Sequence, residues 1–459
     1  MTDSSPSKQI QPPPKGFWPI MRKLGPGLII SGSIVGSGEL IATTTLGAEV
    51  GFVALWLIIL SCGIKVVFQE ELGRYVVSTG DTALQGLNRV PGPKWRVSWV
   101  VWCWWIMTIG VIIQGSGIVG GVGQTLHLFL PQINGTAWAM VAAITVMVLL
   151  FRGRYGTVEK ICVGMVVSFT FVTIACAVLL GWTPYAPTAE DFLSGLRLSL
   201  PAGGIAVAFA AFGLTGVGAA ELIMYPYWVL EKGYARFVGP RIEGSAWDAR
   251  ARGWIRVMQA DVLMAMVVYT TATVAFYILG AAILGEMGTI PAGYEMISTL
   301  SNMYTATLGS GAFYLFLIGA FFVLYSTLFA NVASNSRVIT DFLHLLGVAR
   351  IDTDSQLLFW RRVVIAGIPM LYVILYGWVA QPVIMVVIGG VVQACMLPVI
   401  GFSTIYLRYR HIDRSIRPSL TIDILLWSCS TVMLFMAVYY VVSVRKFKNS
   451  KKSLSEPIL

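Results

Sequence analysis

Long apolar runs separated by short polar loops dominate this chain. A helix needs about 20 mostly apolar residues to cross a bilayer. The runs that qualify cover residues 25–48, 52–77, 97–129, 136–152, 158–182, 200–230, 256–284, 309–345, 361–379, 381–408 and 421–444. The short alternating segments that are typical of a β-barrel do not occur in the sequence. The pattern therefore predicts an all-α polytopic membrane protein with about eleven transmembrane helices.

The composition agrees with this interpretation. Only 12% of the residues are charged and 56% are hydrophobic, whereas about 25% of a soluble domain is charged. All six cysteines fall inside apolar runs and no CxxC pair occurs, so we interpret them as small hydrophobic residues rather than disulfides or metal ligands. No nucleophile–base arrangement or Walker sequence is apparent. We therefore expect no enzymatic activity, no ATP-driven pumping and no cofactor.

The net charge of +10 follows the predicted topology. Alternate loops are basic, as is usual for loops on the cytoplasmic side. The basic positions are Arg89, Lys94, Arg96, Arg152, Arg154, the stretch 231–256, Arg361, Arg362, Arg408, Arg410, Arg414 and Arg417. We therefore expect a cytoplasmic N-terminal arm (1–24), a location in the plasma (inner) membrane of a prokaryote, and no nucleic-acid partner. Eleven spans place the basic tail (445–459) on the outside, against the charge rule, so either the tail tolerates its positive charge there or the number of spans differs by one.

Two seven-residue stretches nearly repeat each other: V-G-S-G-E-L-I at 35–41 and V-G-A-A-E-L-I at 217–223. Each places glycine and then a glutamate, Glu39 or Glu221, inside an apolar run. Matched interruptions of this kind indicate the substrate site of a transporter built from inverted repeats. The separation, 221 − 39 = 182 residues, is about five spans with their loops. We predict repeats over 25–182 and 200–410, an additional span at 421–444, and broken first and sixth helices.

Several stretches resemble the NRAMP family of divalent-metal transporters. The first span matches that family's first helix without a gap. Further matches are R-Y-V-V-S-T-G-D-T-A at 74–83, the segment 325–342, and Q-A-C-M-L-P at 393–398. The resemblance covers nearly the whole chain. It implies a LeuT-like 5+5 fold and secondary-active transport across the bilayer, with a small molecule or ion as substrate.

The resemblance fails at the positions where the family binds metal. The first-helix D-P-G-N becomes Gly36-Ser37-Gly38-Glu39, and the sixth-helix methionine-proline-histidine becomes Ala219-Ala220-Glu221. The third-helix acidic pair falls on Gln114 and Gly117, and the tenth-helix glutamine on Gly390. The loss of the thioether removes a ligand that favours transition metals. The resulting candidate substrate-binding positions are Gly36, Ser37, Gly38, Glu39, Lys65, Gln114, Gly218, Ala219, Ala220, Glu221 and Gly390.

Lys65 lies midway along the second span, where a lysine needs a partner. It pairs with Glu39 or Glu70, snorkels to the inner face, or serves the substrate. The restarted helix near Glu39 provides free N–H groups and the positive end of its dipole, which together suit an anion.

Two substrate classes follow from these residues, and the sequence leaves both open. In the leading hypothesis, a small carboxylate or dicarboxylate moves with protons carried by Glu39 and Glu221, because ionised glutamates would repel it. In the alternative, ionised Glu39 and Glu221 bind hydrated Mg²⁺ or Mn²⁺ as hard oxygen ligands. A non-transporting sensor ranks below both. The oligomeric state is not predicted.

Overall fold

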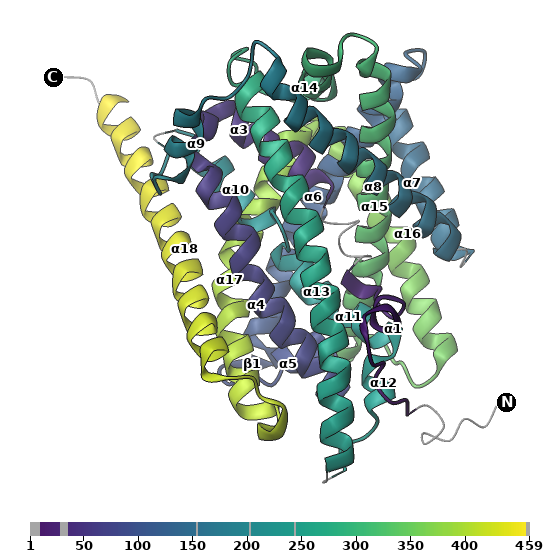
Figure 1. The fold of residues 1–459 in the computed structure, drawn as a ribbon. Helices are drawn as coiled ribbons and strands as arrows, with labels where there is room; N and C mark the ends of the chain where they lie inside the picture. Colours follow the sequence, from purple (N-terminus) through teal and green to yellow (C-terminus); the bar gives the residue numbers. More distant parts are fainter. Residues whose placement is uncertain (1–9, 28–34, 153–154, 202, 243–244, 456–459) are drawn as a thin grey trace.

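The computed structural model describes residues 10–27, 35–152, 155–201, 203–242 and 245–455. Within these ranges the chain forms a bundle of long, roughly aligned helices (Figure 1). The two short strands in this part of the chain, β1 (Lys94–Trp95) and β2 (Val97–Ser98), pair antiparallel as one hairpin. The all-α architecture predicted from the apolar runs is therefore confirmed.

The membrane-spanning helices follow the predicted runs closely. They are η2 (Gly38–Thr43) with α3 (Thr44–Val50), α4 (Leu55–Thr79), α6 (Trp99–Phe129), α7 (Gly135–Phe151), α8 (Tyr155–Leu179), α10 (Ile205–Leu214) with α11 (Ala219–Lys232), α13 (Ser245–Leu279), α15 (Ala312–Leu345), α16 (Asp354–Val379), α17 (Pro382–His411) and α18 (Leu420–Ser455).

Eight helical segments of the described chain are long and apolar enough to cross a membrane, and two shorter apolar helices accompany them. One of the eight, Gly38–Thr79, contains both the end of the first span and the whole second span. Counting that segment as two spans gives 8 + 2 + 1 = 11. This agrees with the predicted number. Residues 28–34, which belong to the predicted run 25–48, lie outside the described residues.

Short elements connect the spans at both ends of the bundle. Those at the end near the N-terminus include α1 (Phe17–Met21), α5 (Ala83–Leu87), α12 (Tyr234–Val238) and η7 (Arg414–Ile416). Those at the opposite end include η3 (Gly51–Ala54), η4 (Leu180–Trp182), α9 (Ala189–Leu196), η5 (Gly280–Leu284), η6 (Gly293–Glu295) and α14 (Met296–Leu308).

Two spans begin earlier than the apolar pattern predicts, and a third helix continues further. The stretch 231–256 was expected to be a surface loop, yet α13 already begins at Ser245. The apolar run 361–379 begins at residue 361, but α16 already begins at Asp354, where the side chains of Thr353 and Gln356 form a reciprocal cap. A capping box satisfies free N–H groups at a helix start, so a helix can begin in polar sequence. The tail beyond residue 445 continues α18 to Ser455.

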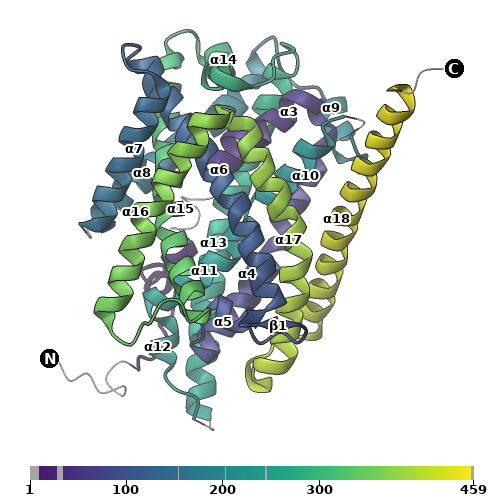
Figure 2. The ribbon, with the colours of Figure 1, turned by 180° about the vertical axis from the view of Figure 1, so that it is seen from behind.

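Glycines let α6 approach α17 closely at the centre of the bundle. The two helices lie side by side (Figure 2). A Cβ atom added to Gly110 would lie 2.8 Å from Val392 Cβ, and one added to Gly117 would lie 2.7 Å from the Pro382 carbonyl oxygen. Small residues permit such contacts between membrane helices. This close contact brings Gln114 of α6 next to α17.

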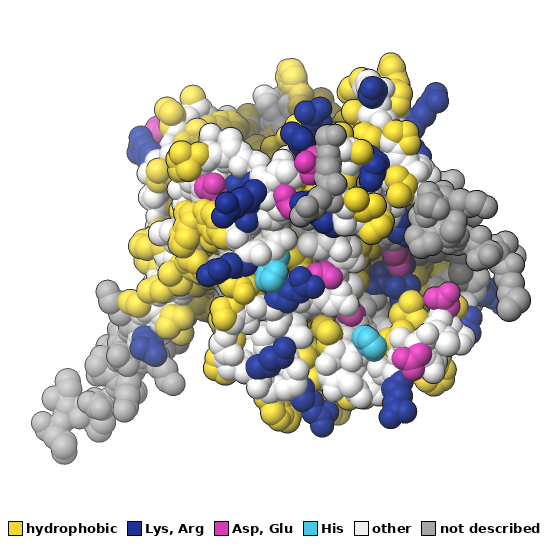
Figure 3. Space-filling model, turned by 90° about the horizontal axis from the view of Figure 1, so that it is seen from below, with side chains coloured by type: hydrophobic (Ala, Val, Ile, Leu, Met, Phe, Trp, Pro, Cys, Tyr) yellow, Lys and Arg dark blue, Asp and Glu magenta, His cyan; other side chains and the backbone are white. Residues whose placement is uncertain are grey.

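The two ends of the bundle differ in charge. The end that carries α1, α5 and α12 displays many Lys and Arg side chains (Figure 3), which agrees with a cytoplasmic face. On this side Arg408 of α17 bridges Glu71 of α4 at 2.8 Å and Asp423 of α18 at 2.5 Å. The last span, α18, runs along the outside of the bundle to the other end (Figure 1). N- and C-terminal segments therefore lie at opposite ends, as an odd number of spans requires.

Candidate functional site

The sixth span is broken where the sequence predicts it. Helix α10 ends at Leu214 and α11 begins at Ala219, with an extended Thr215 (ψ 144°) between them. Gly216 has φ +64°, a conformation that residues with a Cβ rarely adopt. A Cβ there would also lie 3.0 Å from the Cα of Cys62 in α4. The break therefore requires glycine both for its backbone angle and for space.

The first span restarts at the matching place. Val35 and Gly36 form a turn, and the π-helical η2 begins at Gly38. Gly38 lies against the end of α10, because a Cβ added to it would be 3.6 Å from Leu214 Cβ. The start of η2 therefore lies beside the end of α10, where the sixth span is interrupted.

Glu39 is fully buried in the first turn of its restarted helix. Its Oε2 accepts a hydrogen bond from the backbone N–H of Gly36 (3.3 Å), and its Oε1 accepts one from the Thr273 hydroxyl of α13 (3.1 Å). The carboxylate thus caps its own helix start and ties it to the seventh span. Sequence reasoning did not identify Thr273.

Glu221 occupies the equivalent position in the first turn of α11. Its carboxylate folds back to the start of its helix, since a Cβ on Gly218 would lie 2.4 Å from Glu221 Oε2. The same Cβ would lie 3.0 Å from the amide oxygen of Gln393 on α17. Gly218 therefore makes room for two polar side chains. Ala219 and Ala220 complete this turn and are buried.

A hydrogen-bonded chain joins the two breaks. The Gln114 side-chain amide donates to the Ser37 hydroxyl (3.3 Å), and the Gln393 amide donates to the Gln114 carbonyl oxygen (2.6 Å). Gln393 Oε1 in turn accepts from the backbone N–H of Ala220 (3.0 Å). All these side chains are at most 6% exposed. A buried network of this kind fixes the relative position of the groups it joins.

Gln393 is the polar residue of the tenth span that sequence reasoning missed. The family's glutamine was placed on Gly390, but Gly390 is a packing position: a Cβ there would lie 2.7 Å from the Ala210 carbonyl oxygen of α10. Gln393 follows one helical turn later and faces the breaks. Its signal was a single amide within an apolar run, which normally marks an interhelical hydrogen bond.

Lys65 contacts the end of the broken helix α10 and is fully buried. Its Nζ donates to the carbonyl oxygens of Phe212 (2.8 Å) and Thr215 (2.5 Å). The Ser61 hydroxyl, one turn earlier on α4, also donates to the Phe212 oxygen (3.0 Å). Among the ion pairs of the described residues, none joins Lys65 to Glu39 or Glu70. The direct hydrogen-bond partners of Lys65 are therefore backbone carbonyls, and the charges of Glu221 and Glu39 also act on its ammonium.

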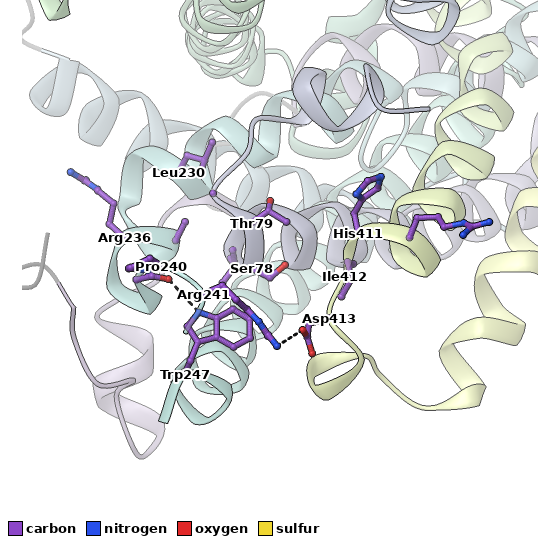
Figure 4. Close-up of a pocket in the computed structure, with 15 residues that line it drawn as sticks. Ser78, Thr79, Leu230, Arg236, Pro240, Arg241, Trp247, His411, Ile412 and Asp413 are labelled. Carbon is purple, nitrogen blue, oxygen red and sulfur yellow. Dashed lines mark hydrogen bonds and ion pairs between the residues drawn. The ribbon is translucent and has the colours of Figure 1, made fainter. Parts of the chain in front are cut away.

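A pocket of 650 Å³ lies apart from the breaks, at the end of the bundle that carries α12 (Figure 4). The ends of α4 and α17 line it together with the α12–α13 segment. Inside it, Arg241 forms a 2.6 Å ion pair with Asp413 and stacks over Trp247 at 4.5 Å. None of the predicted site residues lines this pocket.

Residues 27–443 match the family model described as "Natural resistance-associated macrophage protein-like" (Nramp). The chain belongs to the Nramp family. The family resemblance, the LeuT-like fold and the expectation of a transporter rather than an enzyme are therefore confirmed, and the protein is an Nramp-type secondary transporter in a membrane.

Similar proteins are distant. An uncharacterized protein of Pasteurella multocida is 24% identical over 332 residues, covering 70% of this chain and 71% of its own length. The divalent metal cation transporter MntH of Granulibacter bethesdensis is 22% identical over 413 residues, 87% of this chain and 83% of its own.

Two solved structures share the fold at 14% sequence identity. A mutant of the Eremococcus coleocola manganese transporter has a TM-score of 0.64, covering 94% of this chain and 89% of that one. MhsT in complex with L-phenylalanine has a TM-score of 0.53, covering 91% and 98%.

No cluster of three or more His, Cys, Asp or Glu side chains that could hold a metal exists among the described residues of this Nramp protein. Glu39 is held by the backbone N–H of Gly36 and the hydroxyl of Thr273.

Replacing Gln393 with leucine should uncouple the two breaks. The Ala220 N–H and the Gln114 amide would each lose a buried partner, and each loss costs about 1–3 kcal/mol. We expect a lower thermal midpoint of the purified protein and weaker substrate uptake in proteoliposomes. Gln393→Glu keeps an acceptor for Ala220 but loses the donor to the Gln114 oxygen and adds a buried carboxyl near Glu221, so it should also lose stability. An unchanged midpoint in Gln393→Leu would show that the chain of amides does not connect the breaks.

Proposed function

We propose that this Nramp protein transports a divalent cation, with Mg²⁺ and Mn²⁺ as the expected substrates, through a site built from hard oxygen ligands. The observation that carries the proposal is the pairing of two buried carboxylates, Glu39 and Glu221, in the first turns of the two restarted helices. Carboxylate and amide oxygens suit hard dications, whereas a thioether would select softer metals. The relatives named as divalent metal cation transporters favour the same class.

A partly hydrated ion fits these residues best. Mg²⁺ keeps several waters in protein sites and usually binds one or two carboxylates. In the proposed site Glu39 and Glu221 supply the charge. The side chains of Ser37, Gln114 and Gln393 lie on the chain that joins the breaks and would hold the remaining waters. Gly36, Gly38 and Gly218 would leave space for them.

We further propose that Glu39 and Glu221 take up protons when the cation leaves. Two ionised carboxylates inside a membrane are costly without a counter-ion. Protonation removes that cost and lets the empty carrier return. Proton-coupled transport follows in either substrate hypothesis.

The contacts weaken the case for an organic anion, the leading hypothesis from sequence. Lys65 already binds the carbonyls of Phe212 and Thr215. The helix start at Ala220 is bound by Gln393, and the turn at Gly36 by Glu39. The groups that would attract a carboxylate thus have partners within the protein. A carboxylate substrate remains the second hypothesis because both helices still direct their positive ends at one region.

Uptake by the purified protein in proteoliposomes separates the two hypotheses. We expect saturable Mn²⁺ or Mg²⁺ uptake, with internal pH moving as protons are exchanged, and no uptake of labelled dicarboxylates. Dicarboxylate uptake without cation flux would overturn the proposal. Calorimetry with the cation, the acid and their mixture tests a metal–carboxylate complex, which would bind only when both are present.

A further inference from the structure

The end of α10 forms a set of backbone carbonyls at the centre of the membrane. The last carbonyls of a helix have no partner within it and carry the negative end of the helix dipole. Here the Phe212 and Thr215 oxygens converge on one point, and the Ser61 hydroxyl lies within hydrogen-bond distance of both, at 3.0 and 3.4 Å. Unwound carbonyls at such half-helix ends are the groups that bind monovalent cations in transporters with broken helices.

The ammonium of Lys65 occupies this set of carbonyls. Its distance of 2.8 Å to the Phe212 oxygen is that of a charge-assisted hydrogen bond, and its Nζ also donates to the Thr215 oxygen. The Lys65 Nζ also lies 5.8 Å from the centre of the Phe212 ring, within reach of a cation–π contact. The side chain is fully buried. The position is therefore built for a positive charge and already holds one.

We propose that these carbonyls are a monovalent-cation site that the chain fills with its own lysine. We call this set, the Phe212 and Thr215 oxygens with the Ser61 hydroxyl, the carbonyl cradle. The ammonium of Lys65 stabilises the break between α10 and α11 without Na⁺ or K⁺. The protein therefore needs no monovalent metal ion, either for stability or for transport. The transport part of this inference rests on the proposed function, but the stability part does not.

Removing the lysine should expose the cradle to small cations. In Lys65→Ala the carbonyls lose their partner, and we expect the thermal midpoint of the purified full chain to fall by several degrees in N-methylglucamine chloride. Methylammonium, ammonium, Na⁺ or K⁺ should restore part of the loss in a saturable way. Lys65→Met fills the space with an apolar chain and should not be rescued. Lys94→Ala, in the exposed hairpin, is the matched control and should behave as wild type.

The wild-type protein gives an independent test. Its thermal midpoint and its cation uptake should be the same in Na⁺, K⁺ and N-methylglucamine salts. A saturable stabilisation of the wild type by Na⁺ or K⁺ would overturn the inference, whether or not Lys65→Ala can be purified. Failure of every small cation to rescue a folded Lys65→Ala would overturn it as well. Rescue of Lys65→Ala in a protein that moves no Mn²⁺ or Mg²⁺ would refute the proposed function alone.

Discussion

Replacing Glu39 or Glu221 with glutamine is expected to reduce Mn²⁺ and Mg²⁺ uptake by about 100-fold. This is the upper end of what the loss of a supporting group costs a metal site, and here a charged ligand is lost. Glutamine keeps the shape and one acceptor oxygen for the Gly36 N–H, and its NH2 group can donate to the Thr273 hydroxyl oxygen, so both contacts at position 39 can be kept with one reversed. The fold should survive and only the charge should disappear. Uptake in proteoliposomes and calorimetric titration of the detergent-solubilised protein measure the effect.

Glu49→Gln provides the matched control for this pair of variants. Glu49 lies on α3, the helix that completes the first span. Its side chain is exposed near the C-terminal end of that helix. Its uptake should equal that of the wild type. If Glu39→Gln and Glu221→Gln instead bind substrate normally and lose only the pH dependence of transport, the two carboxyls carry protons alone. The organic-anion hypothesis would then be favoured.

Replacing Gly36 with alanine should disrupt the first helix break. The added Cβ would lie 1.8 Å from Thr327 Oγ1 and 2.8 Å from Thr327 Cβ on α15. Overpacking of this kind costs about 1–3 kcal/mol when neighbours must move. The Gly36 N–H also binds Glu39, so a shift of this turn moves the carboxylate. We expect a lower thermal midpoint and at least about a tenfold loss of uptake, since each 1.4 kcal/mol changes an equilibrium tenfold.

A second substitution tests whether the contact with Thr327 is the cause. Thr327→Ala removes Oγ1, the atom nearest to the added methyl group, and keeps Cβ, so Gly36→Ala with Thr327→Ala should recover part of the lost stability and uptake. Gly63→Ala is the control within a span, because no atom lies within 4 Å of its added Cβ. Equal damage from Gly36→Ala with and without Thr327→Ala would show that another constraint acts at this glycine.

The sequence predicted the fold because its signals are local. Each apolar run predicts its own span, and the repeated V-G-x-x-E-L-I stretches predict both breaks. Neither prediction depends on which residues pack nearby. The exceptions were also local in origin. Thr353 and Gln356 cap α16, so this helix begins within polar sequence. Hydropathy alone does not predict such a cap.

The partners of the buried polar groups were decided only by the tertiary structure. Gln393 meets Gln114 across 279 residues, and Lys65 meets the Phe212 carbonyl across 147. Every residue has a backbone carbonyl, so the sequence does not distinguish Phe212 or Thr215 as the acceptors for Lys65. The sequence by itself determined the spans, the two breaks and their glutamates. Only the packing of helices α4, α6, α10 and α17 decided which groups those breaks bind, because hydrogen-bond partners depend on distances that the order of residues does not contain.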